Sequence, residues 1–348
     1  MKKILSMAAL ALVMAGCSND DENVKIDNGE ASNAVAIQIS QKVAGVESKA
    51  AITPGADMLA TIIMVDESSS TSSPDFAQFT PKTENELMDD GTGGKKLGSD
   101  EKRANVATTE FKANTVAGSI SLTPTLYYPV SANSKKTWIL GVSPQGVVDK
   151  TKVTFNGTAD GSQDVMYAVH QAAGASATDK TNPELTFNHQ TTQLLFVAQL
   201  TDEDLSKTEW KDQTVSVKSI IIQKAQVPTA INIADGSLVC TEKNISVAGC
   251  NTALKATPCA KSTPVMIQEA SSVVVDLILN VGNKTVTYTN LVVQKTSGGG
   301  NLATGAGKSH LITFTITAPV SASDGTKIET TAKIVDWETG EAGKVEIK

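Results

Sequence analysis

Apolar and polar residues alternate along several stretches of this chain with the period of two that is typical of half-buried β-strands. The alternation is clearest in residues 33–43 (NAVAIQISQKV) and residues 284–291 (KTVTYTNL). Other stretches are short and almost wholly apolar, as in residues 59–65 (LATIIMV) and residues 272–279 (SVVVDLIL). No segment sustains the period of a helix, so the pattern predicts an all-β protein.

Further strands are predicted from their content of β-branched and aromatic residues. They span residues 107–111, 119–122, 125–130, 137–142, 152–155, 165–169, 194–200, 215–222, 237–240, 265–267, 310–317, 331–337 and 344–347. Many strands in succession, with no helices between them, favour β-sandwiches.

Two polar stretches interrupt this pattern. Residues 66–98 are rich in Ser, Thr, Pro and Gly and are predicted to form a loop. Loops of this length are uncommon inside compact domains and are often functional. Residues 171–183 are polar and small, and they are predicted to link two domains.

The first residues have the pattern of a secretory leader. Two lysines precede a short apolar run, and Met14-Ala15-Gly16-Cys17 resembles a lipobox. The run is too short to span a bilayer, so residues 1–16 are predicted to be a signal peptide and Cys17 to carry lipid. An ordinary signal peptide with a nearby cysteine is the alternative. Residues 17–32 are predicted to be a lipidated tether, and their acidic start also resembles the surface-export signal of Bacteroidetes lipoproteins.

Length and charge narrow the class of protein. The 348 residues exceed one ordinary domain and fit two. The net charge is −7, and removing the two positive charges of Lys2 and Lys3 with the leader gives −9. An acidic chain argues against nucleic acid and anionic lipid headgroups as partners.

Three cysteines remain if Cys17 carries lipid. Cys240 and Cys250 flank a predicted turn at residues 242–244, and a disulfide between them is one expectation. Buried free thiols, Cys259 included, are the other. No Cys-x-x-Cys or Cys/His spacing suggests a zinc site.

Motifs that would carry catalysis or bind a cofactor are incomplete. Residues 305–309 (GAGKS) resemble the end of a phosphate-binding loop, but the earlier glycine of that motif is replaced by Leu302. Residues 160–164 (DGSQD) space oxygen ligands like a calcium loop but lack its later glycine and glutamate. We therefore expect no enzyme activity, no metal and no cofactor.

Several short motifs carry a family resemblance. Residues 164–168 (DVMYA) precede residues 185–196 (LTFNHQTTQLLF), and residues 308–316 (KSHLITFTI) precede residues 332–337 (AKIVDW). In the first half, Tyr128-Pro129 precedes residues 138–142 (WILGV). In this order and spacing, the motifs resemble the fimbrillin-like lipoproteins of Bacteroidetes, which are the subunits of type V pili.

The resemblance implies a fold and a role. It implies two tandem transthyretin-like β-sandwiches, here residues 33–184 and 185–348, and assembly without catalysis. Family members travel out as lipoproteins, with the precursor held to the outer membrane by its lipid, and a trypsin-like protease then removes the first strand. A strand from another pilin subunit fills the opened groove, and head-to-tail repetition makes a filament.

This sequence supplies candidates for each step. The first strand would be residues 33–43, and cleavage is expected between Lys49 and Ala50, with Lys42 as the second choice. The family pattern prefers arginine, and the only arginine here is Arg103. The donor would be the C-terminal segment, residues 332–348.

Two functions follow from these alternatives. The first is a stalk or tip pilin of a cell-surface fimbria, used in adhesion. The second is a permanently lipid-anchored surface protein that keeps its first strand and binds a glycan or host ligand.

Overall fold

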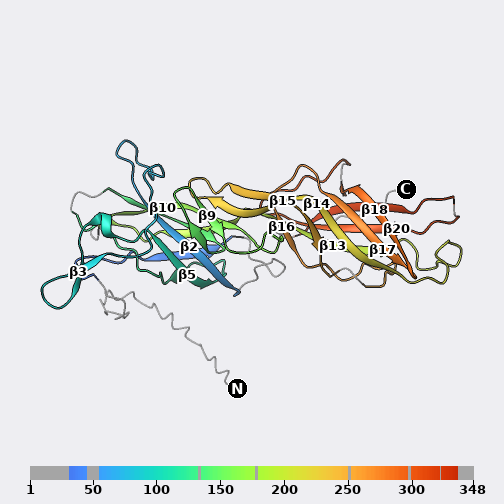
Figure 1. Cartoon of the computed structure of the whole chain (residues 1–348), viewed down its shortest axis with the longest axis horizontal. Helices are drawn as coiled ribbons and strands as arrows, with labels where there is room; N and C mark the ends of the chain where they lie inside the picture. The colour runs from blue at the N-terminus through green and yellow to red at the C-terminus, as the bar shows by residue number, and fades with distance from the viewer. Residues whose placement is uncertain are drawn as a thin grey trace, which may run out of the picture.

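Strands from distant parts of the chain assemble into four sheets among the described residues of the computed structural model (Figure 1). The structure describes residues 31–44, 55–131, 135–176, 179–249, 252–296, 299–321 and 323–335. The molecule is elongated, with an eight-stranded sheet at one end and a five-stranded sheet at the other.

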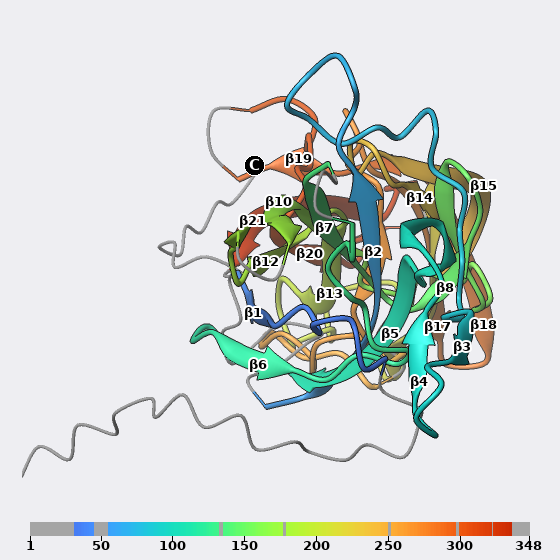
Figure 2. The ribbon, with the colours of Figure 1, turned by 90° about the vertical axis from the view of Figure 1, so that its left-hand side faces the viewer.

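The eight-stranded sheet has the order β5-β2-β7-β10-β12-β1-β6, with β11 added to β10. Its strands are β1 (Ile39–Val43), β2 (Asp57–Asp66), β5 (Val106–Lys112), β6 (Gly118–Ile120), β7 (Thr137–Ser143), β10 (Met166–Ser176), β11 (Asp179–Lys180) and β12 (Glu184–His189). Just after β6, Thr123 exchanges backbone hydrogen bonds of 2.7 and 2.9 Å with Thr108 of β5. The sheet therefore curls until its end strands meet, as the end-on view in Figure 2 shows.

The curled sheet has an apolar core on each face, because successive side chains of a strand point to opposite faces. In β2, Ile62 and Met64 pack inside the curl, whereas Ile63 and Val65 pack on its outer face. This explains why residues 60–65 are mostly apolar: both faces of this part of β2 are buried, whereas Leu59 is exposed.

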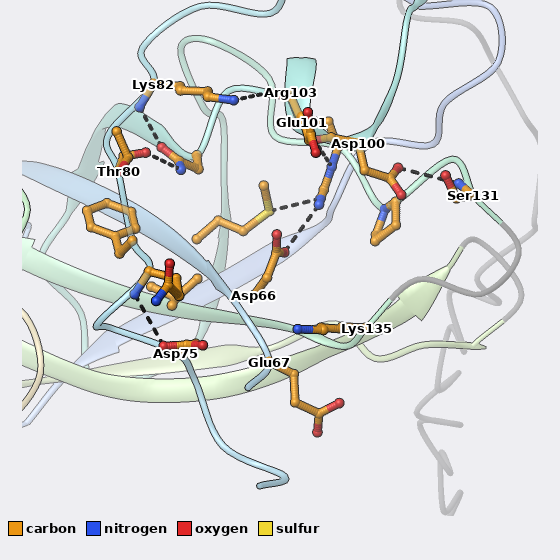
Figure 3. Close-up of a pocket in the computed structure, with 16 residues that line it drawn as sticks. Asp66, Glu67, Asp75, Thr80, Lys82, Asp100, Glu101, Arg103, Ser131 and Lys135 are labelled. Atoms are coloured by element: carbon orange, nitrogen blue, oxygen red, sulfur yellow. Dashed lines mark hydrogen bonds and ion pairs between the residues drawn. The ribbon is translucent and has the colours of Figure 1, made fainter. Parts of the chain in front are cut away.

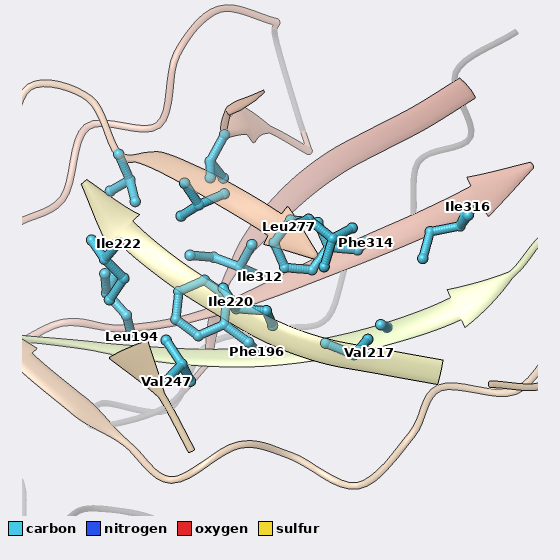
Figure 4. Packing of buried hydrophobic residues seen from close by; sticks show 14 of the residues in the cluster. Leu194, Phe196, Val217, Ile220, Ile222, Val247, Leu277, Ile312, Phe314 and Ile316 are labelled. Atoms are coloured by element: carbon cyan, nitrogen blue, oxygen red, sulfur yellow. The ribbon is translucent and has the colours of Figure 1, made fainter. Parts of the chain in front are cut away.

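Two further sheets face each other in the other half of the molecule, and the six-stranded one also extends over the curled sheet, where Val153 and Phe155 pack in the outer core. The six-stranded sheet contains β8 (Gly146–Val148), β9 (Lys152–Phe155), β14 (Val215–Asn232), β15 (Leu238–Val247), β17 (Val274–Val281) and β18 (Lys284–Val292). The five-stranded sheet contains β13 (Thr192–Leu200), β16 (Val265–Ile267), β19 (Gln294–Lys295), β20 (Ser309–Thr317) and β21 (Lys327–Val335). Between them lies the largest core, in which the rings of Phe196 and Phe314 stack with centroids 6.1 Å apart (Figure 4).

Strand β14 joins the two halves. Its first residues pair with β17, with Val215 opposite Val281, and its last residues pair with β9, with Ala230 opposite Thr154. The 18 residues of β14 extend over about 60 Å. Near its end, Ile231 packs in the outer core of the curled sheet.

The predicted link at residues 171–183 is wrong. Residues 171–176 continue β10, which pairs with β7 and β11. Small residues allow the strand to bulge there, and Gly174 has a φ of 99° that few other residues adopt. Strand β12, whose first residue is Glu184, lies in the eight-stranded sheet, so residues 185–189 belong with the first half.

Most other predicted strands are confirmed, among them residues 59–65 within β2 and residues 152–155 as β9. Residues 125–130 are wrong as a strand, since their strand pairing is a single bridge between Tyr127 and Ala36. Pro129 cannot donate to a ladder, and Tyr128 enters the inner core.

The long stretch at residues 66–98 is mostly loop but contains the hairpin of β3 (Leu87–Asp89) and β4 (Lys95–Leu97). A single 3-10 turn, η1 (Asp100–Lys102), follows it. In the part of the chain that the structure describes, no helix is long and apolar enough to cross a membrane.

Candidate functional site

Strand β1 lies between β12 and β6 near the margin of the eight-stranded sheet. It runs parallel to β12, with Ser40 opposite Glu184, and antiparallel to β6, with Gln41 opposite Gly118. Since β6 has only three residues, β1 is covered on that side by a short strand. The first strand of the described chain is therefore paired on both sides, but through only three residues on the side of β6.

The side chains of β1 alternate between the inner core and the surface. Ile39, Gln41 and Val43 point inward and are at most 3% exposed. On the outer side, the ammonium group of Lys42 lies 2.5 Å from the carboxylate of Glu184. Burial of Ile39 and Val43 stabilises the strand by roughly 1.5–3 kcal/mol each.

Withdrawal of β1 would open a slot in the curled sheet. Its walls would be the freed edges of β12 and β6, and its floor the inner core. The middle of the slot is polar, since Gln41 Nε2 donates a hydrogen bond of 3.3 Å to the backbone oxygen of Lys112. An extended segment with apolar residues at alternate positions has the shape to refill such a slot.

The predicted processing residues fall around β1. Cys17, Lys49 and Ala50 lie outside the described residues. Lys42, the second choice for cleavage, lies inside β1 opposite Thr186. A protease binds its substrate as an extended, accessible segment, so β1 must separate from the sheet before cleavage at Lys42.

Arg103 is not an accessible cleavage site in the folded protein. It is the only arginine of the chain, and 3% of its surface is exposed. Its guanidinium donates to the backbone oxygens of Asp100 (3.1 Å) and Tyr127 (2.9 Å) and to the Asp66 carboxylate (3.2 Å). A protease with strict arginine specificity therefore has no exposed arginine to cut here.

The turn expected at residues 242–244 is wrong, because β15 continues through it. These residues are polar since β15 pairs only with β14 and its other edge is free of strands in the described sheet. Cys240 and Val247 are seven residues apart on this strand, or about 23 Å. Cys250 lies outside the described residues, so its pairing with Cys240 stays a prediction. The extended strand after Cys240 argues against that pairing.

Both cysteines that the structure describes, Cys240 and Cys259, are free thiols. Burial raises the pKa of Cys240 to about 11. The Cys259 sulfur accepts a hydrogen bond of 3.2 Å from the backbone of Ala198. A raised thiol pKa keeps Cys240 protonated and unreactive.

A second feature is a cavity of about 560 Å³ at the end of the molecule that carries η1 (Figure 3). We name it the polar pocket. Its walls are the end of β2, the loop at residues 75–82, the segment from Asp100 to Asn105 and the chain around Pro129 and Lys135. The length of the loop at residues 66–98 suggested a functional role, but no sequence pattern predicted that these four segments meet.

His189 and His310 are buried and have structural roles. His189 and Asp164 form a buried pair with 2.9 Å between the ring Nδ1 and a carboxylate oxygen. Thr191 donates to the same carboxylate. Burial lowers the pKa of His310 to about 4, and the charge of Lys308 adds to the effect.

The other motifs form local turns. In residues 305–309, the Gly307 N–H donates to the backbone oxygen of Thr191 and the chain enters β20 directly. In residues 160–164, Asp160 accepts from the Ser162 N–H at 2.9 Å, which is an Asx turn. Within the described residues, no group of three or more His, Cys, Asp or Glu side chains has the arrangement of a metal site.

Comparison with known families gives one match over most of the chain. The sequence model of a family described as fimbrillin-like matches residues 79–337. No curated protein matches the chain.

Several solved structures are similar over most of their length. A candidate cell adhesion protein from Bacteroides uniformis is 19% identical, with a TM-score of 0.47, over 88% of this chain and 99% of that chain. The tip fimbrial protein Mfa3 from Porphyromonas gingivalis, solved with a C-terminal truncation, is 8% identical, with a TM-score of 0.43, over 87% and 100%. The fimbrial anchor protein Mfa2 from the same organism is 10% identical, with a TM-score of 0.39, over 87% and 99%.

Proposed function

The chain belongs to the fimbrillin-like family, and from this premise we propose that it is a structural subunit, stalk or tip, of a type V fimbria on the cell surface. Its role is adhesion through assembly with other pilin subunits. Two tandem transthyretin-like sandwiches, divided near residue 190, are part of the proposal. The curled sheet, whose strands all precede residue 190, supports that division, whereas β8 and β9 cross it by joining β14 in the six-stranded sheet.

The position of β1 carries the proposal. β1 is five residues long, lies beside the short β6 and presents apolar side chains to the inner core. Its removal frees one edge of β12 for pairing with an extended segment of another subunit. Such a contact joins two different surfaces of the same protein, so it repeats into a filament.

The donor segment begins later than the sequence suggested. Residues 332–335 already belong to β21, where Ala332 pairs with Ile312 and Val335 with Ser309 of β20. They are therefore engaged in the five-stranded sheet, and we assign the donor to residues 336–348. Val345 and Ile347, two positions apart, are its alternating apolar residues.

Export and trimming complete the proposal. Lipid on Cys17 delivers the precursor to the outer membrane, and cleavage between Lys49 and Ala50 releases β1 with the lipid. A protease that accepts lysine is required, since Arg103 is buried. The lipid then serves in delivery and is absent from the assembled subunit.

The test is expression of the full chain in a host that exports lipoproteins to its surface. Wild-type protein should yield polymers whose subunits start at Ala50, measured by mass spectrometry of sheared material. Lys49→Ala should stay monomeric with its lipid, whereas the matched variant Lys207→Ala, in an exposed loop, should behave as wild type.

Deletion of residues 336–348 separates trimming from assembly. The deleted protein should be exported and trimmed but remain monomeric. Filaments of normal length from this variant would remove the donor role, and an intact start at Cys17 in all surface material would refute trimming.

The second candidate function is a permanently lipid-anchored binding protein for a glycan or host ligand. Burial of the only arginine favours this second function. Without an accessible arginine, β1 stays in place unless a protease that accepts lysine acts. The polar pocket also favours it, since a cavity of this size suits a small ligand.

A further inference from the structure

The polar pocket is separate from the slot of β1. None of the residues that line it belongs to β1, β6 or β12. Its volume of about 560 Å³ lies in the range of small-molecule sites. A ligand there would leave strand exchange free to proceed.

Hydrogen bonds hold the walls of the pocket in place. Arg103 ties η1 to β2 through Asp66 and to the chain at Tyr127. Across the pocket, the Asn105 side chain accepts from the Lys82 N–H at 2.6 Å and donates to the Thr80 oxygen at 2.8 Å. These hydrogen bonds fix the walls formed by β2, η1 and residues 80–82, so a ligand need not order them in order to bind.

Charges of both signs face the pocket. Its lining contains five carboxylates and three cations: Asp66, Glu67, Asp75, Asp100 and Glu101, with Lys82, Arg103 and Lys135. An anion would meet the carboxylates, and a cation would meet the basic side chains. A neutral ligand whose groups both donate and accept hydrogen bonds avoids both repulsions.

Three groups in the pocket retain bonding capacity. Neither Glu67 nor Lys135 forms an ion pair within the described residues, and the carboxylate of Asp75 accepts one backbone hydrogen bond, from Gln78. Figure 3 shows Lys135, Glu67 and Asp75 on one side of the pocket, opposite Arg103. Two acceptors and one donor are groups that can hydrogen-bond to the hydroxyls of a sugar.

An aromatic cluster lies next to this wall. Trp138 pairs across strands with Val65, which lines the pocket. The His170 ring packs edge-on against Trp138, with centroids 5.5 Å apart, and against Phe76, with centroids 6.0 Å apart. None of the three rings lines the pocket, so Trp138 is a nearby fluorescence reporter of binding and not a ligand contact.

We propose that the polar pocket binds a neutral carbohydrate, with Glu67 and Asp75 accepting from its hydroxyls and Lys135 donating. The site adds a ligand class to the adhesion role of the proposed function. It does not depend on trimming or polymerisation.

Titration of the full chain tests the site. Galactose, glucose, mannose and N-acetylglucosamine are added singly, and binding is followed by calorimetry and tryptophan fluorescence. At least one should bind saturably, whereas inorganic phosphate and methylamine should not. Absence of saturable binding by all four sugars, or binding of only the anion or the cation, overturns the proposal.

Matched variants locate the site. Glu67→Gln with Asp75→Asn retains an acceptor for the backbone of Lys136 and Gln78, so the fold should persist, as circular dichroism will verify. Loss of the two charged acceptors should weaken sugar binding roughly tenfold or more. Glu209→Gln with Asp324→Asn, both exposed and outside the pocket, should bind like wild type. Equal affinity in the two double variants refutes the pocket as the site.

Failure of this proposal is distinguishable from failure of strand exchange. The chain without residues 336–348 should bind sugar with unchanged affinity even though it stays monomeric. Conversely, the Glu67→Gln with Asp75→Asn variant should polymerise normally.

Discussion

Arg103 shows how one residue fixes the local structure around a cavity. Its guanidinium donates to the backbone oxygens of Asp100 and Tyr127, to the Asp66 carboxylate and to the Met64 sulfur. A lysine at this position would present a single ammonium group in place of a planar fork. The residue therefore determines how η1 meets β2.

Replacing this side chain should be costly. Arg103→Met leaves the buried Tyr127 oxygen without its donor and should lower the free energy of unfolding by about 2–4 kcal/mol. Lys42→Met, which breaks an exposed ion pair, should cost less than about 1 kcal/mol. Urea denaturation of both variants gives the comparison, and equal losses would contradict the structural role of Arg103.

His310 makes stability depend on pH in a defined window. It is 2% exposed, and neither ring nitrogen has a hydrogen-bond partner within the described residues. Burial lowers the pKa of His310 to about 4 from its ordinary value of 6.5. The unfolded chain therefore binds a proton more readily than the folded chain between these two values.

This difference contributes stability above pH 6.5 that is lost as the pH falls toward 4, at most about 3 kcal/mol. His310→Leu should flatten the unfolding free energy across that window while costing little at pH 7.5, since no hydrogen bond is lost. Unfolding curves at half-unit pH steps measure the difference. Parallel pH profiles for the two proteins would show that His310 does not titrate on unfolding.

At the scale of single elements, β1 is short, but its inward-facing side chains are deeply buried. Ile39→Ala removes a core side chain and should lower the free energy of unfolding by about 2–4 kcal/mol. Ser40→Ala, one residue away on the outer side, should change it by less than about 0.5 kcal/mol. Guanidinium denaturation of the two variants tests this. Similar effects would mean that β1 does not present alternate faces to the core and solvent.

The strands that sequence patterns predicted well are those buried on both faces or alternating cleanly, such as β2 and β18. The pattern predicted only residues 215–222 of β14, which continues through polar residues and Pro228 to Asn232. The structure tolerates Pro228 because this part of β14 pairs with β15 alone, and a ladder bulges between Pro228 and Ala230. Pairing partners decide such positions, and a local pattern does not contain them.

The candidate sites were predictable to different degrees. The role of residues 33–43 as a first strand followed from alternation, and β1 confirms its last five residues. The polar pocket did not follow from any local pattern, because its walls come from four segments brought together by the curl of the sheet. In the sequence, charged residues such as Glu67 and Lys135 cannot be distinguished from charged residues of any solvent-exposed loop.

At the scale of the whole molecule, β14 couples the two halves. It pairs with β17 over the largest core, while Ile231 packs under the curled sheet. We therefore expect a single unfolding transition. In a Trp337→Phe background, Trp138→Phe leaves Trp210 to report one half, and Trp210→Phe leaves Trp138 to report the other.

For each variant, the midpoint of the thermal melt followed by tryptophan fluorescence should coincide with the midpoint measured by calorimetry. Midpoints that differ by more than about 5 °C between fluorescence and calorimetry would show that the halves unfold independently.

The same strand has a mechanical consequence. A force applied along the long axis acts along β14, so the hydrogen bonds to β17, β15 and β9 bear the load together in shear. Bonds loaded together resist far more than bonds that peel one after another. A pulling force on this protein is therefore resisted by one continuous strand. Two domains joined by a flexible link would instead move apart until the link was extended.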